Sequence, residues 1–351
     1  MVAVGRSAGL AAVGVAGAEV FTSTRATLHA RRRAGLHGGM QFTYRNPDRS
    51  TDPARVLEGA RSLVVGAWGY RRRDPAVSQI RPHGVVARYA RVDHYAPLRA
   101  GLGRVAEALR ADGWQARVVV DENALVDRAA AQRAGLGWYG RNSLLLLPGL
   151  GSWFVLGSVV TDAPLEHTPP AGHTAAAEGC GSCRRCMAAC PTGALVADGV
   201  LDARRCLAWL VQAPGPFPVE HRAALGARIY GCDECQEVCP VNRAGDRRTP
   251  PAGPEAGSVA SVDLLDLLDA SDDELLATNG RWYLADRDPR YLRRNALIAL
   301  GNVGDGRDPA TTAAVARWSC SDDGLLAEHA RWALARLTSV TATAGATGPA
   351  S

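Results

Sequence analysis

Eight of the nine cysteines of this chain lie between residues 180 and 239, and their spacing is that of ligands to two iron–sulfur clusters. The first run matches the pattern C-x2-C-x2-C-x3-C-P of bacterial ferredoxins, whose fourth cysteine ligates the other cluster. It comprises Cys180, Cys183, Cys186, Cys190 and Pro191. The second run has only three cysteines, so Cys206, which lies between the runs, completes two sets of four. That run comprises Cys232, Cys235, Cys239 and Pro240.

The spacing also predicts which cysteines share a cluster. A [4Fe–4S] cubane has four iron corners, and each corner takes one thiolate. Closely spaced cysteines on one loop reach three adjacent corners, whereas the fourth corner faces away and needs a distant residue. One predicted ligand set is therefore Cys180, Cys183, Cys186 and Cys239. The other is Cys190, Cys206, Cys232 and Cys235. Such a pair of clusters moves single electrons.

Zinc is the alternative occupant, because paired C-x-x-C motifs also bind zinc. The proline-terminated first run favours the clusters over zinc. A disulfide framework is disfavoured, since the chain is far longer than the small secreted domains that need one. The ninth cysteine, Cys320, stands alone in an apolar helical stretch, and we expect it to be a buried small hydrophobic residue.

Composition limits the class of protein. The chain has 351 residues, enough for two or three domains, and its 47% hydrophobic and 21% charged residues are typical of a globular protein. No apolar run is long enough to span a membrane. Residues 9–17 predict a buried first strand, with a signal peptide as the alternative. Reduced cysteines without an export signal predict a cytoplasmic location. The net charge is only +5, and the arginine triplets 31–33 and 71–73 are read as solvated basic faces or as phosphate contacts.

Apolar runs alternate with helical patterns over the first half of the chain. Residues 61–68 and 114–120 read as strands, and residues 95–112 and 127–134 as helices. The runs at 143–147 and 153–160, separated by Pro148-Gly149, predict a hairpin. We therefore predict an α+β multidomain protein that begins with an α/β domain. Its expected parts are an α/β domain (1–170), a ferredoxin-like domain with two [4Fe–4S] clusters (171–250), HEAT-like α-helical repeats (251–338) and a disordered tail (339–351).

The HEAT-like interpretation depends on a faint internal repeat. Residues 295–300 and 329–334 share the pattern Ala-x-x-Ala-Leu within alanine-rich helical stretches. Two unrelated alanine-rich helices are the alternative. Either way, so few repeats cannot form a solenoid alone and must pack on the preceding domain.

Three segments together resemble one family. They are residues 120–143, which contain Ala134-Gly-Leu-Gly-Trp-Tyr-Gly-Arg-Asn142, the eight cysteines with their flanks, and Leu292-Arg-Arg-Asn-Ala-Leu297. In this combination the chain resembles the tRNA epoxyqueuosine reductases over about residues 9–340. The resemblance implies a cobalamin-dependent oxidoreductase that reduces epoxyqueuosine to queuosine at the wobble position of tRNA. It further implies that the N-terminal domain holds cobalamin, the clusters supply electrons, and the helical repeats help to grip the tRNA.

The resemblance also implies roles for single residues. Asp121 corresponds to the acid that protonates the departing epoxide oxygen, and burial beside a macrocycle would raise the pKa of its carboxyl group. Asp127 is expected to be an N-cap or an ion-pair partner in the first turn of its helix. The expected cobalamin contacts are Leu145, Leu156, Ala208, Cys232 and Asp233. The expected partners are tRNA carrying epoxyqueuosine and an electron donor of the ferredoxin or flavodoxin type. We expect a monomer that does not associate with membranes.

The chain departs from the family pattern near the expected pocket. The departures are at Ser50, at Ala87 and at Asp93-His94-Tyr95, where the family order is Asp-Tyr-His. Two other functions fit part of the sequence. One is a small-molecule reductase resembling the reductive dehalogenases, although no twin-arginine signal opens the chain. The other is a ferredoxin-type electron carrier, which would account only for the cysteine-rich segment.

Overall fold

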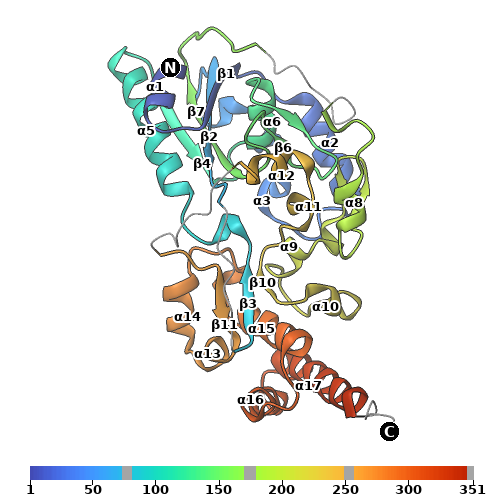
Figure 1. The fold of residues 1–351 in the computed structure, drawn as a ribbon. Coiled ribbons are helices and arrows are strands. Elements are labelled where there is room, and N and C mark those ends of the chain that lie inside the picture. Colours follow the sequence, from blue (N-terminus) through green and yellow to red (C-terminus); the bar gives the residue numbers. More distant parts are fainter. Residues whose placement is uncertain (73–80, 170–178, 249–256, 346–351) are drawn as a thin grey trace. The chain divides into compact units, whose positions relative to one another are not determined.

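The computed structural model describes residues 1–72, 81–169, 179–248 and 257–345 (Figure 1). The chain forms two compact units, each assembled from separate stretches of sequence. The first unit comprises residues 1–75, 93–204 and 234–254. The second unit comprises residues 76–92, 205–233 and 255–351.

A four-stranded sheet forms the centre of the first unit. Its strands, in spatial order, are β1 (Ala12–Gly17), β2 (Ser62–Gly69), β7 (Phe154–Thr161) and β4 (Ala116–Val120), and every neighbouring pair is antiparallel. The predicted strands are confirmed, but the predicted hairpin is wrong. The run at 143–147 contributes β6 (Leu145–Leu146), which pairs with β5 (Trp138–Tyr139), whereas β7 lies between β2 and β4.

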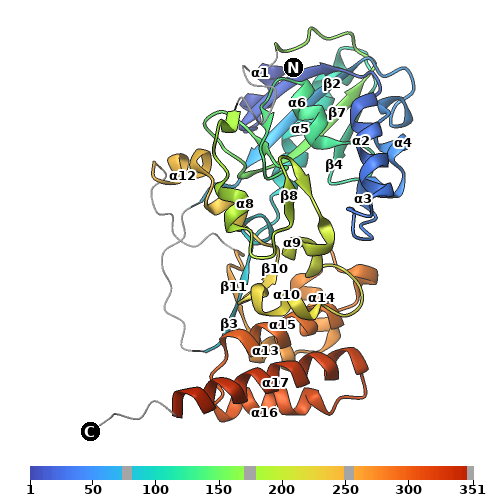
Figure 2. The ribbon, with the colours of Figure 1, turned by 90° about the vertical axis from the view of Figure 1, so that its right-hand side faces the viewer.

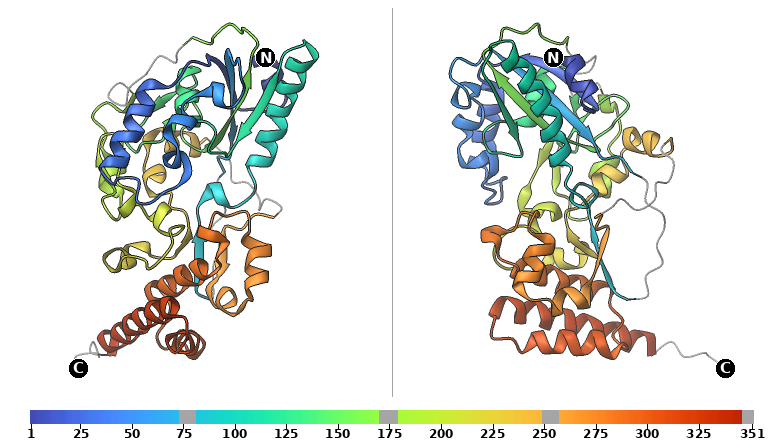
Figure 3. Two further views of the ribbon diagram at one scale, coloured as in Figure 1. Left: turned by 180° about the vertical axis from the view of Figure 1, so that it is seen from behind. Right: turned by 90° about the vertical axis from the view of Figure 1, so that its left-hand side faces the viewer.

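Helices cover both faces of this sheet (Figures 1 and 3). Helix α5 (Tyr95–Ala111) packs against β2, β4 and β7, while α6 (Asp127–Arg133) packs against β1, β2 and β7. Alternate residues of β2 point to opposite faces, so Leu63, Val65 and Ala67 all enter the core beside α6. Helix α5 buries a helical stripe against the other face, as its apolar spacing predicts. The stripe is Leu98, Leu102, Val105, Ala106 and Leu109.

Short elements complete the first unit. They are α1 (Val2–Ser7), α2 (Thr22–Arg33), α3 (Phe42–Arg45), α4 (Pro47–Ser50), the 3-10 helix η1 (Pro53–Arg55), α8 (Arg185–Ala189), β8 (Leu195–Ala197), β9 (Val200–Leu201), α11 (Glu234–Glu237) and α12 (Pro240–Asp246). A further 3-10 helix, η3 (Ala203–Arg205), lies where the first unit passes into the second.

The second unit is mainly helical and carries a small mixed sheet. Strand β3 (His83–Val86) pairs in parallel with β10 (Arg228–Tyr230) and antiparallel with β11 (Ser261–Asp263). The other elements are η2 (Arg88–Ala90), α9 (Leu207–Leu210), α10 (Val219–Leu225), α13 (Leu264–Asp269), α14 (Asp272–Asn279), η4 (Ala285–Arg287), α15 (Arg290–Val303), α16 (Pro309–Ser319) and α17 (Gly324–Gly345).

Helices α15, α16 and α17 lie side by side (Figures 2 and 3). The two Ala-x-x-Ala-Leu segments lie on α15 and α17, and small residues let these helices approach closely. A Cβ atom on Gly301 would lie 2.8 Å from the Cα atom of Ala333, so only glycine fits there without a shift. The disordered tail predicted for 339–351 differs from the structure over residues 339–345, because α17 continues to Gly345, whereas residues 346–351 lie outside the described residues. Its alanines favour the helix once it has begun.

No helix in the described part of the chain has both the length and the apolar character needed to cross a membrane.

Candidate active site and cluster-binding cysteines

Asp121 follows directly after β4, in the position that the sequence predicts. Its backbone has φ 55°, in the left-handed region that non-glycine residues seldom adopt and that aspartate tolerates better than most. Such conformations persist where the surrounding structure holds them, and they gather at functional sites. The loop that bears Asp121 is held from outside, since the Ser50 hydroxyl donates a hydrogen bond of 2.8 Å to the carbonyl of Asn123.

Residues in the first two turns of α5, and Asp93 two positions before the helix, set the electrostatics of Asp121. Desolvation by the surrounding protein raises the pKa of its carboxyl group, although the residue retains exposed surface. The positive charge of Arg99 and a hydrogen bond from the Tyr95 side chain oppose this rise, while the negative charge of Asp93 adds to it. Arg99 also donates to the carbonyl of Val120 at 3.2 Å, which ties α5 to the end of β4. The net result is a carboxyl group that holds its proton to a higher pH than an ordinary aspartate.

The sequence predicts Asp127 to be an N-cap or an ion-pair partner, and the structure contradicts the first of these two roles. It is the first residue of α6, and the N-cap is Val126, so the N-cap prediction is wrong. Burial raises the pKa of Asp127 to about 8, with the charge of Asp121 as the next contribution. Within the described part of the chain its Oδ1 is buried and has no hydrogen-bond partner. Asp127 therefore holds its proton to a higher pH than an ordinary aspartate, since burial favours the neutral form of a carboxyl group.

The departures at 93–95 have structural consequences that the sequence did not reveal. His94 is buried and stacks on Tyr70 with ring centroids 4.9 Å apart. The reversal of histidine and tyrosine thus places an imidazole in a packed position and a phenol next to Asp121. Ala87 lies in the second unit, where its N–H donates to the carbonyl of Tyr230 at 2.9 Å.

We expect Tyr95→Phe to shift the pH dependence of turnover toward higher pH. The Tyr95 hydrogen bond stabilises the ionised carboxyl group of Asp121, so its removal raises the pKa of Asp121 further. A general acid works only while protonated, and kcat/KM falls as pH rises through its pKa in the free enzyme. The measurement is a pH profile of kcat/KM, with the exposed Tyr283→Phe as control. An unchanged profile, or a shift toward lower pH, would contradict the assignment.

The four cysteines of the first predicted set lie within electrostatic reach of one another in the first unit. Helix α8, which carries Cys186, packs against α11, which shortly precedes Cys239. Burial raises the pKa of the Cys186 thiol, and the charges of Cys180, Cys239 and Cys183 raise it further. Burial likewise raises the pKa of Cys239, with further contributions from Cys180 and Cys183. Four thiolates held close together repel one another. The positive charge of an iron core bound between them would offset this repulsion.

Arg141 connects the Gly-Arg-Asn block to these cysteines. Its guanidinium donates to the carbonyls of Gly181 at 2.6 Å and of Cys183 at 2.8 Å, and it forms an ion pair with Asp198 at 2.9 Å. The side chain is almost fully buried. This explains why the block occurs together with the first cysteine run. One arginine fixes the backbone of the ligand loop.

Cys190 belongs to the second predicted set and already has features of a thiolate ligand. Burial raises the pKa of its thiol, but hydrogen bonds from Thr192, Ala194 and Leu195 outweigh this effect and the pKa is lowered. The backbone N–H of Ala194 lies 3.2 Å from the sulfur atom. Hydrogen bonds of this kind to sulfur also influence cluster potentials.

The other members of the second set are divided between the units. Cys235 lies on α11 in the first unit, whereas Cys206 and Cys232 belong to the second unit. Cys206 is the N-cap of α9. Cys232 packs against a small apolar core to which Leu207, the residue after Cys206, also belongs. The second unit thus presents two of the predicted ligands around one core.

The predicted cobalamin contacts are also divided between the units. Leu145 and Leu156 are buried in the core of the first unit, on the α6 side of the sheet. Ala208, Cys232 and Asp233 lie in the second unit. Asp233 accepts a hydrogen bond of 2.7 Å from the N–H of Arg88, yet burial still raises the pKa of its carboxyl group.

Two further expectations are corrected or refined by the structure. Cys320 is exposed at the C-cap of α16 and is not a buried residue, because the apolar stripe of α16 ends before it.

The arginine triplets are not simply solvated faces. Arg31 donates to the carbonyl of Gly199 at 2.7 Å, and Arg71 donates to Gly149 and lies 3.5 Å from Asp246. Arg73 lies outside the described residues.

Comparison with known proteins agrees with this site. A family described as "4Fe-4S double cluster binding domain" matches residues 179–242, which include all eight cysteines. An epoxyqueuosine reductase of Xanthomonas campestris is 34% identical over 94% of this chain and 93% of its own length. One of Lactococcus garvieae is 35% identical over 84% of this chain and 83% of its own length.

Solved structures of epoxyqueuosine reductases share the fold. The enzyme from Streptococcus thermophilus superposes with a TM-score of 0.83 at 28% identity, covering 95% of this chain and 88% of the other. A complex with an epoxyqueuosine-modified tRNA stem loop gives 0.82 at 29% identity with the same coverage. A structure of the Bacillus subtilis enzyme, also at 0.82 and 29% with this coverage, has its catalytic aspartate loop swung out of the active site. With the cysteine pattern and the Asp121 loop already described, these matches show that the chain belongs to the epoxyqueuosine reductases, a family of oxidoreductases.

Proposed function

We propose that this protein reduces epoxyqueuosine in the anticodon of tRNA to queuosine, with Asp121 as the proton donor. The observation that carries the proposal is the state of Asp121. Residue 121 has a left-handed backbone, and hydrogen bonds from Ser50 and Arg99 hold its loop and the end of β4. Burial raises the pKa of its carboxyl group, which favours the protonated form that a proton donor needs. The relatives supply the substrate class, since one of them was solved with an epoxyqueuosine-modified tRNA stem loop.

The reaction requires both the clusters and an acid. Removing the epoxide oxygen leaves a double bond, consumes two electrons and two protons, and releases water. Alkoxide is a poor leaving group unless an acid protonates it, which is the task assigned to Asp121. The second proton comes from solvent. The electrons arrive one at a time, as [4Fe–4S] clusters deliver them.

The proposed ligand sets are those that the spacing predicts. Cys180, Cys183, Cys186 and Cys239 hold the first cluster, and their mutual electrostatic contacts support this set. Cys190, Cys206, Cys232 and Cys235 hold the second. The N–H groups aimed at Cys190 and the shared core around Cys232 and Leu207 support the second set. All eight ligands are thiols, the chemistry that iron–sulfur clusters require.

Cobalamin is the proposed cofactor at the reacting centre, where it would supply a strong reductant for the epoxide. The proposed contacts are Leu145, Leu156, Ala208, Cys232 and Asp233, and they fit in type. Two of them, Leu145 and Leu156, are apolar side chains of the core of the first unit, a residue type that suits contact with a macrocycle. Burial raises the pKa of the Asp121 carboxyl group. Asp121 would protonate the substrate oxygen there.

The remaining proposals concern the domains, the electron donor and the oligomeric state. We propose that residues 1–170 form the cofactor domain, apart from residues 76–92, which belong to the second unit. Residues 251–338 are proposed to form HEAT-like repeats that grip the tRNA. The close packing of α15 on α17 through Gly301 and Ala333 supports a repeat interface. A ferredoxin or flavodoxin type protein is the proposed electron donor, and the protein is proposed to act as a monomer.

A conversion assay tests this function. The anaerobically reconstituted protein is incubated with cobalamin, a reductant and tRNA that carries epoxyqueuosine, and the nucleosides are measured by mass spectrometry. Conversion to queuosine is expected. Binding of cobalamin without any conversion would reject the tRNA substrate, and failure to bind cobalamin would reject the proposed cofactor.

A further inference from the structure

Arg294 on α15 is buried and uses all of its hydrogen-bond donors on neutral acceptors. The two terminal NH2 groups of its guanidinium donate to the carbonyls of Ala213 at 2.8 Å, Gly215 at 2.6 Å and Leu210 at 2.8 Å. Its Nε–H and one of the terminal NH2 groups also donate to Oδ1 of Asn295, at 3.2 and 3.0 Å. No carboxylate among the described residues forms an ion pair with it, and burial lowers its pKa to about 10. A guanidinium that lacks an anionic partner but is fully hydrogen-bonded is suited to fixing backbone geometry.

The three carbonyls belong to the segment that follows Cys206. The N–H groups of Trp209 and Leu210 both donate to the carbonyl of Cys206 at 2.9 Å, so Cys206 and Leu210 are joined by one rigid turn. The carbonyl of Leu210 in turn accepts from Arg294. A continuous series of hydrogen bonds therefore connects α15 to the predicted ligand Cys206.

Asn295 extends this connection to a second predicted ligand. Its amide NH2 group donates to the carbonyl of Val211 at 2.8 Å and to the carbonyl of Ile229 at 3.1 Å. Ile229 lies in β10, three residues before Cys232. Asn295 is completely buried. One side chain therefore bridges the segment after Cys206 and the strand before Cys232.

Apolar packing also joins α15 to the segments that carry Cys206 and Cys232. The small core against which Cys232 packs contains Leu207, Leu210 and Val211 from the segment after Cys206, and Ile298 from α15. Ile298 lies one turn beyond Arg294 and faces the same side of the helix. Helix α15 is thus the common support of both segments.

We propose that Arg294 and Asn295 are positioning residues for the second cluster, because they hold the segments that carry Cys206 and Cys232 in one fixed relation. The inference rests on the proposed ligand set of that cluster and goes beyond it. It gives the Leu-Arg-Arg-Asn-Ala-Leu segment a role in building the cluster site of this unit, where the sequence had assigned it to the helical repeat. Arg141 provides a parallel in the first unit, where it holds the carbonyls of Gly181 and Cys183.

The test measures iron and the EPR spectrum of the dithionite-reduced, full-length protein after anaerobic reconstitution. Wild type is expected to hold about eight iron atoms per chain, four in each cluster. Arg294→Lys keeps a positive charge but replaces the five-donor fork with three donors on one nitrogen. We expect it to retain about half of the iron, as loss of one of two four-iron clusters requires. Its spectrum should match that of Cys206→Ala and differ from that of Cys180→Ala.

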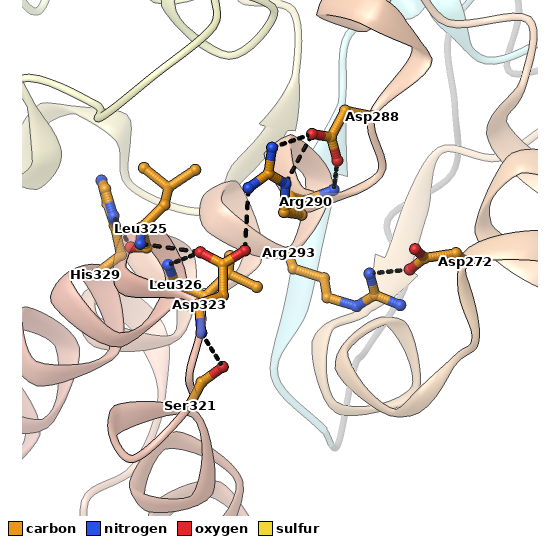
Figure 4. A network of polar contacts seen from close by, with 9 residues as sticks. All are labelled: Asp272, Asp288, Arg290, Arg293, Ser321, Asp323, Leu325, Leu326 and His329. Atoms are coloured by element: carbon orange, nitrogen blue, oxygen red, sulfur yellow. Dashed lines mark hydrogen bonds and ion pairs between the residues drawn. The ribbon is translucent and has the colours of Figure 1, made fainter.

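Arg293→Lys is the matched control. Arg293 is the neighbouring buried arginine on the same helix, but it pairs with Asp272 (Figure 4). It also donates to the carbonyl of Ala270 at 2.7 Å, a residue of neither cysteine segment. It should keep the full iron content. Asn295→Ala is a second variant. It loses the bridge and the acceptor of two Arg294 hydrogen bonds, while Arg294 keeps its positive charge and its bonds to the three carbonyls. Circular dichroism checks the folding of every variant.

Three outcomes would overturn the inference. Full iron in folded Arg294→Lys and Asn295→Ala proteins would show that the bridge does not position the ligands. Equal iron loss in Arg293→Lys would show a general destabilisation of α15. About four iron atoms in wild type, unchanged in Cys206→Ala, would refute the proposed ligand set itself, and this result is distinct from the other two.

Discussion

Asp121→Asn should lower the turnover of epoxyqueuosine-containing tRNA by about 10²- to 10⁴-fold, the range that a positioned general acid contributes. Asparagine preserves the size and shape of the side chain but has no proton to give to the departing oxygen. The left-handed backbone at residue 121 suits asparagine as well as aspartate, so the loop should keep its conformation. Iron content and cobalamin binding should therefore match wild type. The measurement is the rate of queuosine formation by nucleoside mass spectrometry.

Glu122→Gln is the control for this variant. It removes a negative charge from the adjacent position of the same loop, where Glu122 is exposed and faces Arg117 at 3.8 Å. Exposed ion pairs of this kind contribute about 0–1 kcal/mol, so the variant should retain its activity. Full activity in Asp121→Asn, or an equal loss in Glu122→Gln, would remove Asp121 as the acid.

Cys239→Ala should remove the first cluster and reduce the iron content from about eight to about four atoms per chain. Turnover supported by a protein electron donor should be lost with it. Cys239 is the predicted distant ligand of this cluster, and its thiol lies within electrostatic reach of Cys180 and Cys183. The remaining cluster should give the same EPR spectrum as Cys180→Ala.

Cys320→Ala is the matched control, because Cys320 is exposed and lies outside both runs. It should keep all of the iron. If the EPR spectrum of Cys239→Ala matched that of Cys190→Ala and not that of Cys180→Ala, Cys239 would be a ligand of the second cluster. That result would contradict the proposed ligand sets.

Local pattern was sufficient for most elements of the fold. The strands at 62–69 and 116–120 and the helices at 95–111 and 127–133 were predictable, because apolar spacing along the chain reflects the face that each element buries. The predicted hairpin was wrong because strand pairing is not local. The runs at 145–146 and 154–161 are neighbours in sequence, yet β7 lies between β2 and β4 and β6 pairs with β5.

The sequence by itself determined the cluster chemistry of this protein, and the matching family confirms it, because [4Fe–4S] clusters are held by cysteine thiolates, most of them at spacings that a short loop can span. Tertiary structure alone decided what surrounds those ligands and Asp121. Tyr95 and Arg99 act on Asp121 from another element, and Asn295 joins carbonyls that lie far apart along the chain. The physical reason is that hydrogen bonds and charges depend on distances in space, which the spacing of residues along a chain does not contain.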